Sequence, residues 1–252
     1  MLRSIYLSAT NMVLQRAKVD VITNNIANTD TTGYKSDKVV SRSFSDMLIS
    51  RLDDPNVVRT SQQIGSLNTG VHVDELVTDF SQGTFEQTDM NANLAINGEN
   101  AFFTIATAAG ERYTRDGSFF VNAEGYLVTS TGDRVMGENG AIRVNTAEFS
   151  VDAQGNVKVG NQTVGKLRIV SFSDTAALRK TGDNLFYNYG GAAVTAAAGF
   201  SVKQGFLEVS NTNITSQVVD LMSASRSYET SQRIVKMLDE SLGKTVNEVG
   251  RV

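Results

Sequence analysis

Apolar residues recur with a helical period at both ends of the chain. Near the N-terminus they return every seven positions, as Ile5, Met12, Val19 and Ile26. Near the C-terminus the same interval holds for Leu221, Tyr228, Val235, Leu242 and Val249. Seven residues are close to two helical turns, so each set lies on one face of a helix. We predict helices over residues 2–28 and over Thr215–Val249.

The C-terminal pattern is too long for one small domain to cover. As a single helix its 35 residues extend roughly 52 Å, at about 1.5 Å per residue. A stripe of this length needs a partner helix, and the N-terminal stripe supplies one. Ala224 and Ser231 fall at the d-type positions of the heptad, and their small side chains permit two helices to approach closely. We therefore predict paired terminal helices that contact further copies; the alternative is a two-helix hairpin within a monomer.

From about Val57 to Val209 the pattern changes to short β-type runs separated by turn signals. Asn97-Gly98 predicts a type I′ hairpin between 94–96 and 102–105. Two further hairpins are predicted around 122–125 and 152–156. Turns at this spacing indicate an antiparallel sandwich or barrel-like domain. The predicted fold class is α+β, with paired terminal helices and a central antiparallel all-β domain.

The segments between these parts carry turn and loop signals. The run 28–33 ends the first helix, and Gly33 can take the positive φ of a chain reversal. A stretch with helical spacing follows and stops before Pro55; its apolar residues are Phe44, Met47, Leu48 and Leu52. The Gly/Ala-rich run 190–199 predicts an exposed loop, and 211–213 offer caps for the last helix. The predicted division is 1–35 with 211–252 as a terminal helical assembly domain, 36–70 as a connector and 71–210 as a β-rich outer domain.

Composition excludes several classes of function. The net charge is only -4 and charged residues make up 20%, so no strong field for nucleic acid or an anionic membrane is expected. The absence of Cys and the single His72 argue against thiolate chemistry, disulfides and transition-metal sites; we expect His72 to be a surface or strand residue. No apolar run reaches the ~18–20 residues of a membrane span, and the first thirty residues do not form a signal peptide. These signals suggest a cytosolic protein but leave the compartment open.

Acidic residues near predicted turns are the remaining candidates for chemistry, and they are Asp116, Glu124, Asp133 and Asp152. Two of them could form a glycosidase-like pair, but acidic residues in hairpins are usually turn-formers. The run 152–156 lacks the repeated carboxylates and terminal Glu of a calcium loop. No phosphate- or dinucleotide-binding glycine motif occurs. We expect no enzyme activity, no cofactor and no catalytic or metal site.

Three sets of residues occur in one order along the chain. The first is Asn24-Asn25-Ile26-Ala27-Asn28 followed by Thr32-Gly33-Tyr34-Lys35. The second is 94–98, Phe102-Phe103, 113–119 and 125–128, which read LAING, FF, YTRDGSF and GYLV. The third is 204–211, QGFLEVSN, with Arg226-Ser227-Tyr228-Glu229 in the helix beyond. Together they resemble the bacterial flagellar rod and hook protein family, and most closely its short rod-forming members, including the distal-rod type.

The resemblance implies a structural subunit of the flagellar basal body. In that family the terminal helices pair as a coiled coil that lines an axial tube, and the β-rich middle forms an outer layer. Subunits stack helically around a central export channel, and the rod carries torque from motor to hook. Implied partners are further copies of the chain, other axial proteins of rod and hook, and the flagellar type III export machinery. Export by that route would place a protein without a cleaved signal peptide outside the cytoplasmic membrane.

The resemblance also assigns roles to residues. An assembly interface is expected at the heptad residues of both stripes and at Asn25, Asn28, Gly33 and Tyr34. Turn or motif roles are expected for Asn97, Gly98, Gly117, Gly205, Leu207 and Glu208. Asn100-Ala101 stand where the family often has Gly, which suggests a wider turn. Two other classes stay open at this stage: a soluble β-rich module that binds carbohydrate or cell wall with a helical dimerisation region, and a hydrolase that uses loop carboxylates.

Overall fold

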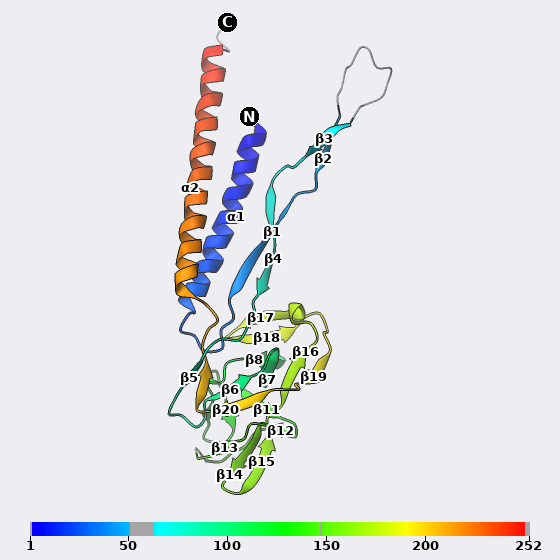
Figure 1. The fold of residues 1–252 in the computed structure, drawn as a ribbon, viewed down its shortest axis with the longest axis vertical. Coiled ribbons are helices and arrows are strands. Elements are labelled where there is room, and N and C mark those ends of the chain that lie inside the picture. The colour runs from blue at the N-terminus through cyan, green and yellow to red at the C-terminus, as the bar shows by residue number, and fades with distance from the viewer. Residues whose placement is uncertain (1, 51–62, 147, 250–252) are drawn as a thin grey trace. The chain divides into compact units, whose positions relative to one another are not determined.

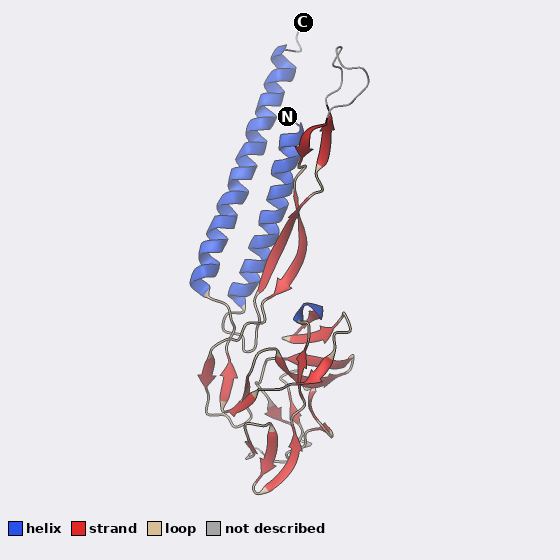
Figure 2. Cartoon of the chain, turned by 45° about the vertical axis from the view of Figure 1, so that its right-hand side comes forward, coloured by secondary structure: helices blue, strands red, loops and turns tan. Residues whose placement is uncertain are grey.

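The terminal segments form two long helices. α1 spans Leu2–Ala27 and α2 spans Ile214–Lys244, continued by a π-helical segment, η2, Thr245–Val249. The computed structural model describes residues 2–50, 63–146 and 148–249. Figure 1 and Figure 2 both show α1 and α2 side by side and antiparallel. Both predicted helices are confirmed, except that the last five residues of the second adopt π-helical geometry.

The chain divides into two compact units. The first, here called the helical unit, comprises Met1–Ile26, Asp37–Val77 and Ile214–Val252. The second, here called the β unit, comprises Ala27–Ser36 and Thr78–Asn213. Helices at both ends with mostly antiparallel strands between them confirm the predicted α+β class.

A narrow β-ribbon completes the helical unit. β1 (Asp37–Ser43) pairs with β4 (Val71–Thr78), and β2 (Met47–Ser50) pairs antiparallel with β3 (Gln63–Leu67). The helical reading of Phe44, Met47 and Leu48 is therefore wrong, and Leu52 lies outside the described residues. β-branched side chains at Val39, Val40 and Ile49 favour strands. The pairing partner of β2 is distant in sequence, so local spacing alone did not reveal it.

The largest sheet of the β unit has ten strands. Its main path runs β17-β18-β8-β7-β11-β10-β9, with β12 on β11, β16 on β7 and β19 on β16. The first strands are β7 (Ala101–Thr107), β8 (Gly110–Thr114), β9 (Phe120–Val121), β10 (Leu127–Val128), β11 (Arg134–Gly137) and β12 (Gly140–Ala141). The later ones are β16 (Ile169–Phe172), β17 (Leu178–Gly182), β18 (Leu185–Asn188) and β19 (Val194–Ala196), with a 3-10 turn η1 at Thr175–Ala177.

Three small sheets complete this unit. β13 (Ser150–Val151), β14 (Asn156–Val159) and β15 (Gln162–Lys166) form one of them. β20 (Ser201–Gln204) pairs with β6 (Leu94–Asn97), and β21 (Phe206–Glu208) pairs with β5 (Phe85–Gln87). These two pairs join the last extended stretch of the chain to strands more than a hundred residues earlier.

The core of the β unit lies on both faces of β7. Side chains alternate along a strand, so Phe103 enters one apolar cluster and Phe102 the other. Phe103 packs in the larger cluster with Phe119, Leu127 and Leu167, among others. Phe102 joins the smaller, aromatic cluster with Tyr113, Phe172 and Phe186. The β unit thus buries its own apolar side chains.

Two of the three predicted hairpins are confirmed. Leu127 pairs with Val121 across Gly125 (φ 82°), and Val151 pairs with Val157 across Gly155 (φ 82°). The hairpin predicted at Asn97-Gly98 is wrong, because β6 pairs with β20 and lies in a different sheet from β7. Neither residue of that pair has a positive φ; Asn100 does, at 55°. The run 190–199, predicted as a loop, contains the exposed strand β19.

Candidate assembly surface and the junction beside it

Small side chains and two amide contacts accompany the pairing of α1 with α2. Ala224 and Ser231 of α2 are 5% and 4% exposed, so the small heptad positions do face inward. The Asn11 side-chain amide donates to Ser231 Oγ at 2.8 Å. Near the other end of the pair, the Asn25 amide donates to Gln217 Oε1 at 3.4 Å. These contacts fix the antiparallel register of the two helices.

The predicted heptad stripes lie at the edge of this contact. Their described members are all half-buried: Ile5, Met12, Val19, Ile26, Leu221, Tyr228, Val235 and Leu242. The side chain of Val249 lies outside the described residues. The stripes therefore lie on the sides of the helices that are partly covered within one chain. Their part in contacts between chains stays a prediction.

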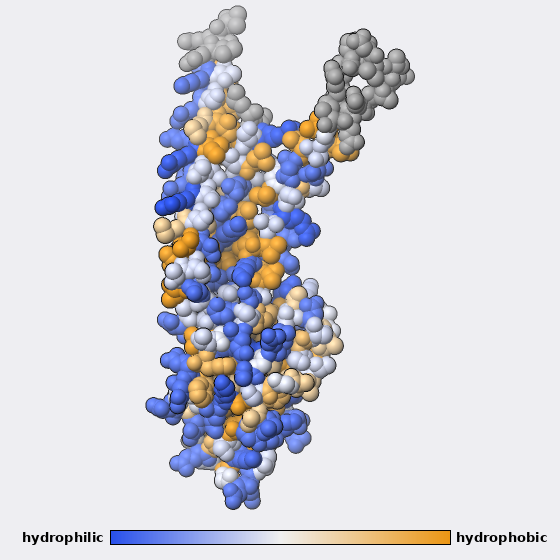
Figure 3. Space-filling view, viewed as in Figure 1, coloured by the Kyte–Doolittle hydropathy of each residue, from blue (hydrophilic) through white to orange (hydrophobic). Residues whose placement is uncertain are grey.

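A second apolar set, which the sequence analysis did not single out, is exposed on the helical unit. Val13 is 67% exposed on α1, and Val219 and Met237 are 60% and 59% exposed on α2. Leu48 at the outer end of the ribbon is 70% exposed. Figure 3 shows hydrophobic surface over the helices and the ribbon on the face that it draws. The number of large apolar side chains exposed on this unit makes it the candidate interaction surface.

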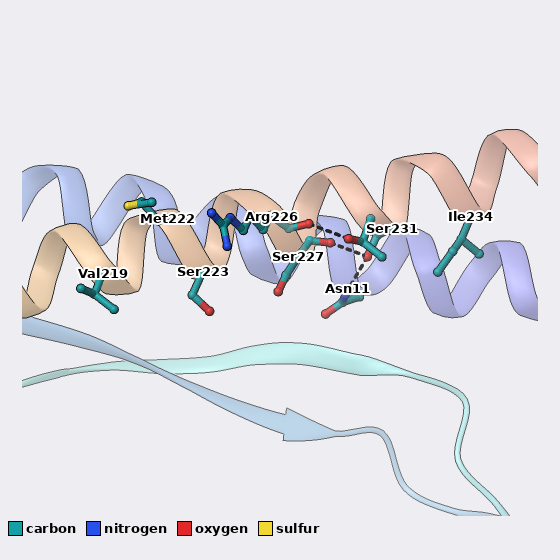
Figure 4. A pocket seen from close by; sticks show the side chains of 9 residues that line it. Asn11, Val219, Met222, Ser223, Arg226, Ser227, Ser231 and Ile234 are labelled. Atoms are coloured by element: carbon teal, nitrogen blue, oxygen red, sulfur yellow. Dashed lines mark hydrogen bonds between the residues drawn. The ribbon is translucent and has the colours of Figure 1, made fainter.

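A groove of about 590 Å³ follows one flank of α2. Its lining includes the apolar side chains of Val219, Met222 and Ile234 and the cation of Arg226. Serines 223 and 227 and Asn11 of α1 supply polar groups. Figure 4 shows Val219, Ser223, Ser227 and Ile234 pointing to the same side of α2. Its apolar members Val219, Met222 and Ile234 lie outside the heptad positions, and no regular apolar spacing in the sequence identifies this flank.

The segment that follows α1 is held by short polar contacts. Within the helical unit, Asn25 donates from its amide to the Asp37 carbonyl and accepts from the Asp37 amide, at 2.8 and 3.0 Å. In the β unit, Asn28 accepts from Thr31 through its side chain and its carbonyl. The Tyr34 ring is 5% exposed, with Lys180 Nζ 4.3 Å from its centroid. Residues at the predicted junction are thus ordered by specific partners.

Gly33 can only be glycine at its place in the β unit. Its φ is 66°, and its amide donates to the Glu208 carbonyl at 2.8 Å. A Cβ on Gly33 would lie 2.3 Å from the Asp116 amide nitrogen. Beside it, Thr32 Oγ1 donates to Asp116 Oδ1 at 2.8 Å. The reversal after the first helix is therefore packed directly against the 115–116 turn.

A buried ion cluster lies next to this reversal. Lys35 Nζ is 2.6 Å from Glu208 Oε1, and Arg115 Nη1 is 3.3 Å from Glu208 Oε2. All three side chains are at most 1% exposed. Such ions need further hydrogen bonds to be tolerated away from water. Lys35 also donates to the Ser81 carbonyl at 2.8 Å, and Gly83 donates its amide to Glu208 at 2.9 Å.

Arg115 connects the cluster to the 94–98 motif. Its Nη2 donates to the Gly98 carbonyl at 2.8 Å, and its Nη1 reaches the Ile96 carbonyl at 3.4 Å. Its guanidinium carbon lies 5.2 Å from the Phe102 ring centroid. Instead of forming the predicted hairpin turn at Asn97-Gly98, this segment presents the carbonyl oxygens of Ile96 and Gly98 to a buried cation.

Burial shifts the proton affinity of both cations of the cluster. Loss of hydration lowers the pKa of Lys35 below its ordinary value of 10.5, and the neighbouring Glu208 carboxylate opposes this only in part. Burial likewise lowers the pKa of Arg115, again opposed by Glu208. Because Glu208 is the only anion within ion-pair distance of either side chain among the described residues, its removal would leave two buried cations uncompensated.

Close backbone approaches explain the remaining motif glycines. A Cβ on Gly117 would lie 1.6 Å from the Leu94 carbonyl oxygen, so only glycine fits there. Gly205 has a φ of 74° and lies between β20 and β21, where its amide donates to the Asn93 carbonyl. Leu207 follows in β21 and pairs with Glu86 of β5.

The Asn211 side chain does not cap α2. It accepts from the Ser36 amide at 2.8 Å and donates to the Asp79 carbonyl at 2.7 Å. It thereby ties three chain crossings of the β unit together. Of the run 211–213, predicted to offer caps for α2, Asn211 instead links segments of the β unit.

The three motif sets of the family resemblance therefore meet at one place. Lys35 comes from the first set, Arg115 from the second and Glu208 from the third. Sequence reasoning named Glu208 but missed Lys35 and Arg115. The usable signal was a charged residue inside each of the three motifs, with Lys35 and Arg115 of one sign and Glu208 of the other.

The acidic residues weighed for catalysis have local structural partners. Asp116 accepts from the amide and hydroxyl of Ser118, and Asp152 accepts from the amide of Asn156. Glu124 forms an exposed ion pair with Arg134, and Asp133 accepts from the Thr131 hydroxyl. His72 lies in β4 with its ring 4.8 Å from that of Phe44, as expected for a strand residue.

Three family models match along the chain. Residues 5–35 match flagella basal body rod protein, residues 95–159 match the flagellar hook protein FlgE/F/G D1 domain, and residues 203–248 match the flagellar basal body rod FlgEFG protein C-terminal region. The matched ranges contain Lys35, Arg115 and Glu208, respectively.

Curated relatives match over nearly the whole chain. Flagellar hook-basal body complex protein FlhO of Bacillus subtilis is 32% identical and covers 100% of both chains. Flagellar basal-body rod protein FlgF of Caulobacter vibrioides is 31% identical, over 99% of this chain and 98% of its own. Flagellar basal-body rod protein FlgG of Bacillus subtilis is 32% identical, over 98% and 99%. The chain belongs to the flagellar basal-body rod protein family.

Membership makes this chain a structural rod subunit and places it in the flagellar basal body. FlgF- and FlgG-named relatives match it almost equally well, so identity does not separate those two types. The alternative of a carbohydrate-binding module finds no support among the relatives. In the part of the chain that the structure describes, no helix is long and apolar enough to cross a bilayer.

Proposed function

We propose that this rod-family chain polymerises through α1 and α2 into a tubular shaft that transmits torque from motor to hook. In the assembled state the two terminal helices pair as a coiled coil, and the half-buried heptad residues take part in contacts between chains. Its partners are further copies of itself and other axial proteins of rod and hook. The chain acts as a structural element and not as an enzyme.

The exposed apolar surface of the helical unit is the observation that carries this proposal. Fully burying a large aliphatic side chain is worth about 1.5–3 kcal/mol. Val13, Val219 and Met237 leave more than half of their surface in water, so assembly that covers them has a large driving force. Two exposed helices also offer two different surfaces, which suits growth in an open series.

We further propose that the subunit reaches its place through the flagellar type III export machinery. The helical unit contains few buried apolar residues, which suits a segment that stays unfolded until it meets its neighbours. Copies would then order their helices at the growing end of the rod. A pulse-labelled export assay in a strain that lacks this export machinery tests the route: the chain should remain in the cytoplasm.

Sedimentation velocity over a concentration series tests the polymerisation itself. The full chain should grow without a fixed end point, and Met222→Asp should raise the concentration at which polymer forms, because it puts a charge into the apolar groove. Val164→Asp is the matched control, since Val164 is 45% exposed on the β unit. A full chain that stays a fixed dimer or a monomer at every concentration would refute the proposal.

A further inference from the structure

The α2 groove runs along the contact with α1, because Asn11 of α1 and its partner Ser231 are among the lining residues. Of its lining residues, Val219 and Met222 are 60% and 51% exposed, whereas Ser231 is 4% exposed. From Val219 to Ile234 the groove extends roughly 22 Å along the helix axis. Among the residues that the structure describes, the Arg226 guanidinium in this groove has no ion-pair partner. The groove therefore offers two apolar ends around an uncompensated cation.

The outer face of α1 carries an anion and an apolar group at a spacing that matches the Arg226–Ile234 part of the groove. Tyr6, Val13 and Asp20 follow one another at intervals of seven and lie on one exposed line of the helix. Tyr6 is 52% and Val13 67% exposed. Within the described part of the chain, the Asp20 carboxylate has no ion-pair partner. This line presents two apolar groups and then an anion, over roughly 21 Å.

We propose that the outer face of α1 from a second copy of this chain docks in the α2 groove, with Asp20 against Arg226 and Val13 against Ile234. The inference rests on the proposed polymerisation and names the surfaces that carry it. Seven residues separate Asp20 from Val13, and eight separate Arg226 from Ile234, so both contacts form in one antiparallel register. An apolar contact beside a partly desolvated ion pair gives affinity and register together.

The antiparallel direction follows from Tyr6. With Asp20 opposite Arg226, an antiparallel α1 places Tyr6 near Glu240, inside α2. A parallel α1 would place Tyr6 near Thr212, before α2 begins at Ile214. Only the antiparallel register covers all three side chains. It is also the direction in which α1 and α2 pair within one chain, where Asn11 meets Ser231.

The contact joins two different surfaces of the same molecule. A chain that offers its α1 face to one neighbour still offers its α2 groove to another. Such a heterologous contact does not close on itself in a dimer, and it propagates unless the rotation between copies closes a ring. The pairing of these two surfaces therefore accounts for open-ended growth.

Cysteine cross-linking tests the pairing directly, because the chain contains no Cys. A Val13→Cys chain is mixed with an Ile234→Cys chain and oxidised, so that any 13–234 disulfide joins two molecules. The expected product is a mixed dimer, identified by its cross-linked peptide. The matched control replaces Ile234→Cys by Asp239→Cys, which lies about half a turn around α2 from the groove. The mixed dimer should not form between the Val13→Cys and Asp239→Cys chains. Equal yields of mixed dimer from the 13–234 and 13–239 pairs would overturn the inference.

A charge exchange tests the ion pair in the full chain. Asp20→Arg and Arg226→Asp should each raise the polymerisation threshold roughly ten-fold, and the double variant should restore it. If the wild-type chain polymerises but the thresholds do not move and the 13–234 product does not form, this pairing is wrong and the proposed function stands. If the wild-type chain stays monomeric throughout and no 13–234 product forms, the proposed pairing and the proposed polymerisation both fail.

Discussion

The two units of this chain treat apolar side chains in opposite ways. In the β unit, two clusters around β7 bury the large apolar residues, and five described ones are exposed. In the helical unit, sixteen described large apolar residues are exposed, and of the apolar residues only Leu14 and Ala224 are buried. The β unit therefore has an apolar core of its own, whereas the helical unit leaves much of its apolar surface uncovered. The difference supports the proposal that the helical unit carries assembly, while the β unit holds the buried apolar core.

Breaking the ion cluster should produce the largest loss of folding stability. Glu208→Gln leaves Lys35 and Arg115 buried without a counter-charge, which should lower the free energy of unfolding by about 3–5 kcal/mol. Urea unfolding followed by tyrosine fluorescence measures this, since the chain has seven Tyr and no Trp. The control Glu124→Gln removes an exposed pair and should cost less than about 1 kcal/mol. Equal effects would show that the cluster does not hold the β unit together.

The next largest effect is expected for Gly117→Ala, because its Cβ would collide with the Leu94 carbonyl oxygen. This substitution should lower the free energy of unfolding by about 2–4 kcal/mol. The same unfolding measurement applies. Gly165→Ala is the control, since its nearest neighbour would be 3.9 Å away and its φ is not positive. An unchanged unfolding midpoint for Gly117→Ala would mean that β6 can move away from the 116–118 turn without cost.

In the helical unit, Ala224→Leu should separate the helices at a closely packed position and cost about 1–3 kcal/mol of local stability. In assembled chains, hydrogen exchange of α1 and α2 should rise while exchange in the β unit stays constant. Gln232→Leu, on the exposed surface of α2, should leave hydrogen exchange unchanged in the helices and in the β unit. If protection in the β unit fell together with that of the helices, the two units would not be energetically separate.

The smallest expected effect concerns acid stability of the β13–β14 hairpin. Hydrogen bonds from Asn156 hold the pKa of Asp152 below its ordinary value of 3.8. The unfolded chain therefore binds a proton at Asp152 more tightly than the folded chain does. The Asp152 carboxylate stabilises the fold above pH 3.8, and this stabilisation is lost as the pH falls through the folded pKa of Asp152. Asp152→Asn should flatten the decline of stability in that acid range, as measured by urea unfolding at several pH values. A decline as steep as in the wild type would assign the acid sensitivity to other groups.

Local signals predicted the elements that form from neighbouring residues. Both helices follow from the seven-residue spacing, and two hairpins follow from Gly125 and Gly155. The Asn97-Gly98 prediction failed because β6 is completed by β20, which no local signal announces. The ribbon was misread for the same reason, since the partner strand of β2 lies beyond a long intervening segment.

The sequence by itself determined the terminal helices, the β-rich middle and the family resemblance. These depend on residue spacing, composition and motif order, which can be read along one chain. Only the tertiary structure showed that Lys35, Arg115 and Glu208 share one buried site, and that the groove face of α2 is left open. Burial and ion pairing depend on distances between residues far apart in sequence. A periodic pattern identifies the face of a helix, but the fold decides which face its own chain covers.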